Sequence, residues 1–576
     1  MFNISRNKII VILLIVNVLA AGAWFYVRRS QQRIDLATYV PESALGYLEV
    51  KDWPQLLDDF ASTKAWQQLA PAYGVENRLD YLGRIGWLAR LGGSSEPAIL
   101  ARSQFAIVIT GIEVEGDQIR PQLALIAATH SGEEAVRKVI DARLPELARR
   151  IYGREAKQTS EYGGVKLESY AAKRADRQLL SAQIGGEWIL ANHLQSMRAC
   201  IDTRLGRSPS MANNFYLRNT RPLVSPDGNL FGFVTGEGVA RLSRFGAFLL
   251  ASGAMREKSI ADFLQDVVSD LAARASDGIA YGASFENGEV IDRHALLVKP
   301  GLVDKLKPAI KVNPGLPQAF NYIPPAVKEA TIINVQDPHR TLDGIEAAVS
   351  AHLGVAQSFL LHQFLLSTRE AIFGGKAGAQ SPIGNEIATF GFNDRSEDRV
   401  WLVAARDRGS LTGVIERYLS LNGATIQRQA YQGVEILKSS EARRGAAAFI
   451  GEFVALGGSP QLVRLIETHR RGQSLKTAPG FAAAGSPPGA AAVLSLSSVK
   501  EDSNEAMVVL ARWLGGQPNP GSGPKALDQL PFSISSTSLN EQGLYIESHS
   551  PFGNLPFLVL MVDGAAEKSA DGAARR

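Results

Sequence analysis

One pattern of strand-like runs, turns and helix-like segments occurs twice in this 576-residue chain, and it constrains the fold more than any other feature. Each copy opens with Tyr, an aliphatic residue and Pro, first at Tyr39 and again at Tyr322. An alternating run follows in both copies, and Asp and Pro then precede a segment with helical periodicity. In the first copy Asp52 stands two residues before Pro54, which predicts that the Asp52 carboxylate caps a helix with Pro in its first turn.

The two copies also share five β-rich runs in the same order. The paired runs begin at Phe105 and Ile387, at Leu123 and Val400, at Tyr162 and Tyr431, at Ala182 and Ala448, and at Ala283 and Ser536. Because short polar or Gly-containing turns lie within and between these runs, we expect them to form hairpins. Helix-like segments stand between the hairpins, so the predicted fold class is α+β, with mostly antiparallel sheets and packed helices.

The repeat sets the expected domain organisation. We expect two tandem duplicated α+β domains at residues 39–300 and 322–562, joined by a stiff Pro-rich linker at residues 301–321. Residues 1–33 are expected to form an N-terminal transmembrane anchor and a short polar stalk. Residues 563–576 are expected to be a disordered tail.

Residues 9–27, IIVILLIVNVLAAGAWFYV, contain no charged side chain. At about 1.5 Å per helical residue, such a run nearly crosses a hydrocarbon core of roughly 30 Å. The aromatic residues at its end suit a membrane interface. The run therefore predicts an uncleaved transmembrane helix, with the membrane as the partner of residues 9–27. The alternative is a signal peptide cleaved near Ala23, where Ala21, Gly22 and Ala23 form a small-x-small pattern.

The rest of the chain is expected outside the cytoplasm, because a leader as short as the one before residue 9 usually stays inside while the long segment is translocated. We expect a single-pass protein of the bacterial inner membrane whose body faces the periplasm or the cell exterior. The formal net charge is only +4 and charges of both signs are interspersed, which argues against a nucleic-acid partner. Cys200 is the only cysteine, so an intrachain disulfide is excluded.

The sequence contains none of the catalytic motifs that are recognisable by spacing. It has no HExxH, no GxSxG elbow, no complete P-loop and no GxGxxG after a strand. The eight histidines show no metal-ligand spacing, and a single cysteine excludes a zinc site built on cysteines. We therefore expect no metal and no cofactor, and the pattern singles out no catalytic residue.

His294 and His549 are the candidate site residues. They occupy equivalent places in the two copies, six residues after Gly288 and Gly543 respectively. One hypothesis is a paired ligand or proton-handling site. The favoured interpretation is that each histidine is a strand residue, partly exposed or hydrogen-bonded within a hairpin.

The Tyr-x-Pro openings, the YxGV strands at Tyr162 and Tyr431 and the Ile-Gly hairpins that follow them together resemble an uncharacterised bacterial family. It is a domain-of-unknown-function family of membrane-anchored envelope proteins. The resemblance implies α+β repeats behind an N-terminal anchor. It implies no catalytic residues, because none is established for such a family.

These features favour a single-pass envelope protein that serves as a non-enzymatic binding or scaffold module. Its partner would be an envelope protein, a lipid or a periplasmic polymer. The alternative is an envelope hydrolase whose carboxylates meet only in three dimensions, since catalytic groups need not be neighbours in the chain. A purely structural spacer ranks third.

Overall fold

The computed structural model describes residues 33–563, apart from gaps at 92–94, 116–117, 153–156, 172–177, 227, 243–274, 308–310, 314, 336–337, 351–361, 364–365, 367–380, 394–397, 485–489, 518–522, 557–558 and 561–562. The expected anchor at residues 9–27 lies outside the described residues, as does the expected tail after Asp563. Among the helices that are described, none has the length and apolar character needed to cross a bilayer.

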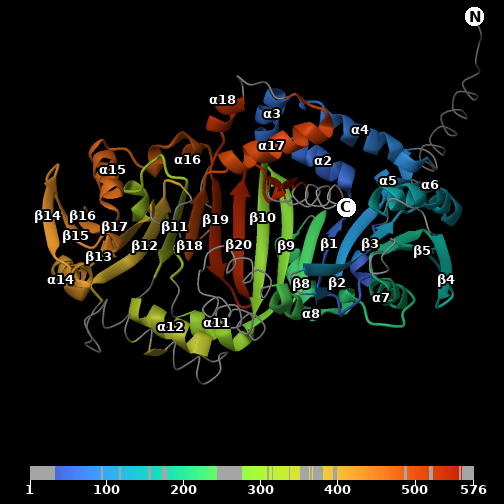
Figure 1. Ribbon diagram of the computed structural model, residues 1–576, viewed down its shortest axis with the longest axis horizontal. Helices are drawn as coiled ribbons and strands as arrows, with labels where there is room; N and C mark the ends of the chain where they lie inside the picture. Colours follow the sequence, from blue (N-terminus) through green and yellow to red (C-terminus); the bar gives the residue numbers. More distant parts are fainter. Residues whose placement is uncertain are drawn as a thin grey trace, which may run out of the picture. The chain divides into compact units, whose positions relative to one another are not determined.

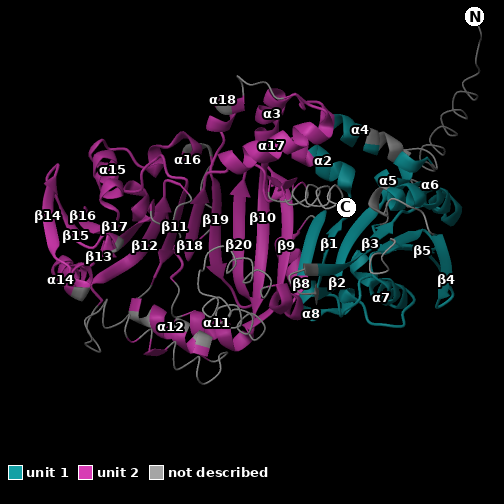
Figure 2. Ribbon diagram, viewed as in Figure 1, with its two compact units in different colours: residues 1–58, 79–218, 228–233 teal, residues 59–78, 219–227, 234–576 magenta. Residues whose placement is uncertain are grey.

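Two compact units make up the chain (Figure 2). Unit 1 comprises residues 1–58, 79–218 and 228–233, and unit 2 comprises residues 59–78, 219–227 and 234–576. These units follow spatial contacts, and their bounds differ from those of the two sequence repeats. The repeat boundaries at residues 39–300 and 322–562 stay a prediction.

The sheet of unit 1 follows the order β8-β1-β2-β3-β7-β6-β5-β4. Figure 1 labels β8, β1, β2, β3, β5 and β4 of this sheet. Every pairing from β1 to β4 in this order is antiparallel. The strands are β1 (Gly46–Val50), β2 (Gln104–Glu115), β3 (Gln118–Ala128), β4 (Lys157–Tyr162), β5 (Val165–Ala171), β6 (Gln178–Ile184), β7 (Glu187–Ala191) and β8 (Leu230–Thr235).

The sheet of unit 2 follows the order β9-β10-β20-β19-β18-β11-β12-β13-β17-β16-β15-β14, and every pairing in it is antiparallel. The strands are β9 (Ser276–Glu286), β10 (Glu289–Val298), β11 (Glu329–Asn334), β12 (Ile383–Gly391), β13 (Val400–Ala405), β14 (Ile426–Tyr431), β15 (Val434–Ser439), β16 (Ala446–Ile450), β17 (Phe453–Gly457), β18 (Val493–Ser497), β19 (Ser533–Leu539) and β20 (Gly543–Ser550). The predicted α+β class, with antiparallel hairpins in both halves of the chain, is confirmed.

Helices connect these strands. They are α2 (Trp53–Ala61), α3 (Lys64–Leu69), α4 (Arg78–Leu91), α5 (Glu96–Arg102), α6 (Glu133–Tyr152), α7 (Leu194–Arg204), α8 (Phe215–Val224), α11 (Pro300–Leu306), α12 (Pro338–Ser350), α14 (Arg408–Leu419), α15 (Ser459–Arg470), α16 (Pro479–Ala483), α17 (Lys500–Leu514) and α18 (Gly523–Asp528). Helix α11 occupies part of the segment expected to be a Pro-rich linker. The predicted cap at Asp52 is confirmed, because the Gln55 N–H donates to Asp52 Oδ1 at 2.9 Å in the first turn of α2.

In unit 1, α6 covers one face of strands β5, β6 and β7. Its apolar residues recur every three or four positions, which places them on one side of the helix. There Val136, Ile140 and Leu144 pack against Tyr170 and Leu190 of β5 and β7.

In unit 2, helices cover different faces of the sheet at different places. The main core lies on one face of β11, β12, β13, β16, β17 and β18, where α15 contributes Leu462, Leu465 and Ile466. On the opposite face, α14 packs Leu411 and Ile415 against the β15 to β17 region. The candidate histidines lie farther along this sheet, on β10 and β20.

Candidate functional site

His294 and His549 lie on neighbouring strands but face opposite sides of the sheet. In the register of β10 and β20, His294 lies opposite Ile546, whereas His549 lies opposite Ile291. The two histidines are therefore offset by three positions. Because successive strand residues alternate between faces, an odd offset separates the side chains. The two rings do not meet in one site, and each has its own surroundings.

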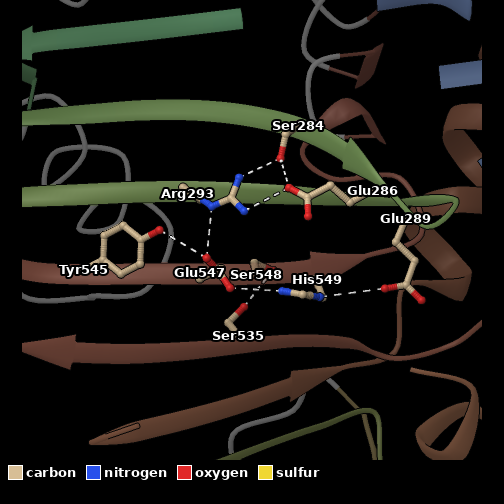
Figure 3. Close-up of polar contacts among 9 residues, drawn as sticks. All are labelled: Ser284, Glu286, Glu289, Arg293, Ser535, Tyr545, Glu547, Ser548 and His549. Carbon is tan, nitrogen blue, oxygen red and sulfur yellow. Dashed lines mark hydrogen bonds and ion pairs between the residues drawn. The ribbon is translucent and has the colours of Figure 1, made fainter. Parts of the chain in front are cut away.

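His549 belongs to a polar cluster on the face of the sheet opposite to that of His294 (Figure 3). We call it the Arg293 cluster, and its members are Ser284, Glu286, Glu289, Arg293, Tyr545, Glu547 and His549. Three neighbouring strands, β9, β10 and β20, supply these side chains.

Arg293 uses all three of its guanidinium nitrogens within the cluster. Its Nε donates to Glu547 Oε2 at 3.0 Å, its Nη1 to Ser284 Oγ at 2.7 Å and its Nη2 to Glu286 Oε1 at 3.2 Å. The Ser284 hydroxyl in turn donates to Glu286 at 3.0 Å. Arg293 thus joins all three strands through charge-assisted hydrogen bonds.

Glu547 is shared between Arg293, His549 and Tyr545. The nearest His549 nitrogen, Nε2, lies 3.2 Å from Glu547 Oε1, and the Tyr545 hydroxyl donates to Oε2 at 3.2 Å. Burial alone would raise the pKa of Glu547, but the hydrogen bonds from His549 and Arg293 outweigh burial and lower it. Burial, followed by the nearby Glu547 charge, raises the pKa of Tyr545 to about 12. The cluster therefore holds an ionised Glu547 and a neutral tyrosine near neutral pH, as in a satisfied structural network.

His294 lies on the other face, at a cavity of about 480 Å³. We call it the Asp292 cavity. It is lined by Ile279, Asp292, His294, Leu296, Ser533, Ser535, Ile546, Ser548 and Asn554. Apolar residues of β9, β10 and β20 alternate in this lining with hydroxyls from β19 and β20, a composition typical of small-ligand sites.

Asp292 is the carboxylate of this cavity. Its side chain is buried, and its Oδ1 accepts a 2.7 Å hydrogen bond from the Tyr281 hydroxyl. Burial raises the pKa of Asp292 to about 6, although the hydrogen bonds from Tyr281 and from the Asn554 backbone act in the opposite direction. Asp292 consequently changes its protonation state close to neutral pH.

The His294 ring lies beside Tyr281, with the ring centroids 5.0 Å apart. Burial lowers the pKa of His294, so the ring is neutral near pH 7. Its Nδ1 is buried and has no hydrogen-bond partner within the described part of the chain. A neutral imidazole and a titrating carboxyl thus stand side by side at the cavity.

The turn at Gly553 closes in on Asp292. Gly553 has a φ of +57°, and a Cβ added there would lie 2.6 Å from Val290 Cγ1 and 2.8 Å from Asp292 Oδ2. Glycine is therefore required both by the left-handed backbone and by the close approach.

Sequence reasoning named the two histidines and missed Asp292, Tyr281 and Arg293. A local signal for the neighbourhood of Tyr281 and Asp292 was present, because Asn287 and Gly288 are typical of a two-residue hairpin turn between their strands. A turn there sets Glu286 opposite Glu289, and counting back along the strands then places Tyr281 opposite His294. The pairing of β10 with β20, which completes both sites, joins residues about 250 positions apart and leaves no local signal.

The comparison with known families concerns the second half of the chain. Residues 384–569 match the model of a family described as a protein of unknown function, DUF3352. The expected resemblance to a domain-of-unknown-function family is thereby confirmed. The DUF3352 match includes His549 and Glu547 on β20, while Asp292, Arg293 and His294 on β10 precede it. No curated protein and no solved structure matches the chain.

Proposed function

We propose that this chain is a non-enzymatic binding module of the cell envelope, tethered through residues 9–27, and that it binds its ligand at the Asp292 cavity. The observation that carries the binding role is the lining of that cavity. Apolar side chains of Ile279, Leu296 and Ile546 meet the hydroxyls of Ser533, Ser535 and Ser548 within about 480 Å³. A few polar groups within an apolar wall give a site both affinity and orientation.

The envelope location rests on the sequence alone, through the uncharged run at residues 9–27. A fusion of alkaline phosphatase after Asp563 tests it, since this enzyme is active only outside the cytoplasm. We expect an active fusion. An inactive fusion, together with an active cytoplasmic reporter at the same position, would overturn the proposed orientation.

We further propose that the two halves arose by duplication of one α+β module. Support comes from the order of strands. The order β4-β5-β6-β7-β3-β2-β1-β8 in one half has the same connectivity as β14-β15-β16-β17-β13-β12-β11-β18 in the other. Along each sheet the strands first follow chain order, then run against it, and end with the last strand. Such an eight-strand order is an improbable coincidence between unrelated folds.

The binding role is tested with N-phenyl-1-naphthylamine, an uncharged aromatic probe that fluoresces in apolar surroundings. Full-length protein in lipid nanodiscs is titrated with the probe, and nanodiscs that contain only residues 1–33 give the background. We expect saturable binding that is lost in Ile546→Trp, because the larger ring fills the cavity. The matched control is Ile107→Trp, since Ile107 lies on β2, is not among the residues that line the cavity and is already 48% exposed.

Saturable binding that persists in Ile546→Trp would overturn the assignment of the cavity. Absence of any binding above background would overturn it as well. The melting temperature of each variant shows whether it is folded.

The second candidate is an envelope hydrolase, and the protonation of Asp292 favours it. A carboxyl group with a pKa of about 6 is suited to exchange protons near neutral pH. Glycoside hydrolysis generally needs two carboxyl groups, and Asp292 is the carboxylate among the residues that line the cavity. Hydrolysis of a cell-wall polymer that is abolished in Asp292→Asn, with probe binding retained, would replace the binding proposal by this one.

A further inference from the structure

Two rows of side chains cross the sheet of unit 2 on the face that carries the Asp292 cavity. The hydroxyl row consists of Trp401, Thr389, Thr331, Ser495, Ser535, Ser548 and Asp292, each directly opposite the next on the neighbouring strand. The apolar row beside it consists of Val403, Ile387, Ile333, Val493, Thr537, Ile546 and His294 in the same register. Because residues opposite one another on paired strands share a face, both rows lie on one side of the sheet.

Within the described part of the chain, large side chains of both rows are exposed, while the β13 end of the apolar row is covered. Trp401 is 46% exposed and Ile333 is 37% exposed, although both are large apolar side chains on a sheet. Val403, at the end of the apolar row, packs against the α14 cluster instead. The hydroxyl of Thr389 and the side chain of Asp292 are buried, so the accessible groups of the hydroxyl row are Trp401, Thr331, Ser495, Ser535 and Ser548.

The hydroxyl row has hydrogen-bonding capacity beyond its internal contacts. Thr331 and Ser495 share one hydrogen bond of 3.2 Å, and Ser535 donates to Ser548 at 2.9 Å. Two hydroxyls together offer two donors and four acceptor lone pairs. In the Thr331–Ser495 pair the shared bond uses one donor and one acceptor, so one donor and several acceptors remain for a ligand. Ser548 also lies 3.3 Å from the Ser533 hydroxyl, so we count only acceptors at the Ser535–Ser548 pair.

The dimensions and the charge of the two rows limit the class of ligand. Seven strands at a spacing of about 4.8 Å place Trp401 and Asp292 roughly 29 Å apart along the row. The ligand that fits such a row is linear and polyhydroxylated. Among the fourteen residues of the two rows, Asp292 and His294 are the ionisable ones, and both lie at the cavity end. A row without fixed positive charge does not suit a polyanion.

We propose that the two rows bind a linear, uncharged glycan, which lies across the strands from Trp401 to the Asp292 cavity. This inference rests on the proposed binding function and names its ligand class. Sugar rings present apolar C–H faces and hydroxyl edges. The apolar faces pack on Trp401, at the end of the hydroxyl row, and on Ile333 of the apolar row, while the sugar hydroxyls bond to the Thr and Ser hydroxyls of the hydroxyl row. N-acetylated sugars fit best, because their methyl groups pack on the aliphatic side chains.

The test is a length series measured by titration calorimetry. Full-length protein in nanodiscs is titrated with chitobiose and with chitohexaose, the dimer and the hexamer of N-acetylglucosamine. We expect the hexamer to bind at least tenfold more tightly than the dimer, since only the hexamer contacts several strands at once. Trp401→Ala should remove most of this advantage, as truncation of an aromatic anchor does in other interfaces.

Trp513→Ala is the matched control, because Trp513 on α17 is 47% exposed and lies outside both rows. Equal affinity of the two oligomers, or an unchanged hexamer affinity in Trp401→Ala, overturns the glycan row. If neither sugar binds while N-phenyl-1-naphthylamine still enters the cavity, the glycan inference fails and the proposed function stands. If the aromatic probe also fails to bind, both are overturned.

Discussion

Asp292 and Arg293 are consecutive residues of β10, yet they serve two different environments on opposite faces of one sheet. Arg293 donates to Glu547 on β20, at 3.0 Å, and joins the charged groups of three strands. Asp292 points away from these charges and accepts from the Tyr281 hydroxyl at 2.7 Å beside the cavity. The sheet thereby separates an ion-pair network, which fixes the strands, from a buried carboxyl group that is free to titrate.

The first prediction concerns the pH dependence of stability through Asp292. Its pKa is about 6 in the folded protein and 3.8 in the unfolded chain, so the folded state keeps a proton that the unfolded chain releases. The stability that this proton contributes is present below pH 4 and is lost as pH rises through 6. A displacement of this size corresponds to about 3 kcal/mol. Asp292→Asn should therefore gain about 3 kcal/mol relative to the natural protein between pH 4 and pH 8.

Urea unfolding of full-length protein at several pH values measures this gain. Glu547→Gln provides a control of opposite sign, because the pKa of Glu547 is lowered in the folded state. The stability that Glu547 contributes is present above its unfolded pKa and is lost as pH falls. Parallel stability curves for Asp292→Asn and the natural protein would contradict the buried, titrating state of Asp292.

The second prediction concerns the Arg293 cluster. Arg293 is 12% exposed and Glu547 is 24% exposed, so solvent screens their ion pair only in part. Arg293→Leu leaves Glu286 and Glu547 without their shared cation and should lower the free energy of unfolding by about 2 kcal/mol. Combining it with Glu547→Gln should cost less than the sum of the two single changes, by about 1 kcal/mol. Strict additivity in this double-mutant cycle would show that the contact contributes nothing.

The hairpins and the α+β class follow from local sequence, whereas the site does not. Asn287 and Gly288, with φ values of 54° and 79°, form the tight turn that the hairpin pattern of β9 and β10 predicts. The alternation of Asp292, Arg293 and His294 then assigns each side chain to a face. Nothing in the neighbouring sequence indicates that β20 is the partner of β10, because that pairing is fixed by packing between distant segments.

The equivalence of His294 and His549 in the repeat was likewise insufficient to predict their geometry. Equivalent positions come together only if the register between β10 and β20 places them opposite one another. The actual register places His294 opposite Ile546, three residues from His549. A repeat in sequence therefore identifies corresponding strands, and the tertiary pairing decides which of their side chains meet.

The third prediction concerns two threonines that lie opposite one another in the hydroxyl row. The Thr389 hydroxyl is buried and has no hydrogen-bond partner among the described residues, whereas the Thr331 hydroxyl bonds to Ser495. Thr389→Val keeps the shape and removes an unsatisfied polar group, so it should raise the free energy of unfolding by about 1 kcal/mol. Thr331→Val removes a hydrogen bond and should lower that free energy by about 0.5 kcal/mol. Urea unfolding compares the two, and equal effects of the two changes would contradict the difference in their bonding.

The last prediction uses Cys200 as a reporter of unfolding in unit 1. Cys200 lies on α7 with no exposed surface, and burial raises the pKa of its thiol to about 12. Since the thiolate is the reactive form, the native protein at pH 8 should react with a disulfide reagent on the order of a thousandfold more slowly than an exposed thiol.

The matched control is Gln195→Cys in a Cys200→Ser background, which places a thiol on the exposed side of the same helix. Because the chain has one cysteine, the rate of labelling in increasing urea reports the opening of α7 alone. Rapid labelling of Cys200 without denaturant would contradict the packing of α7 against its sheet.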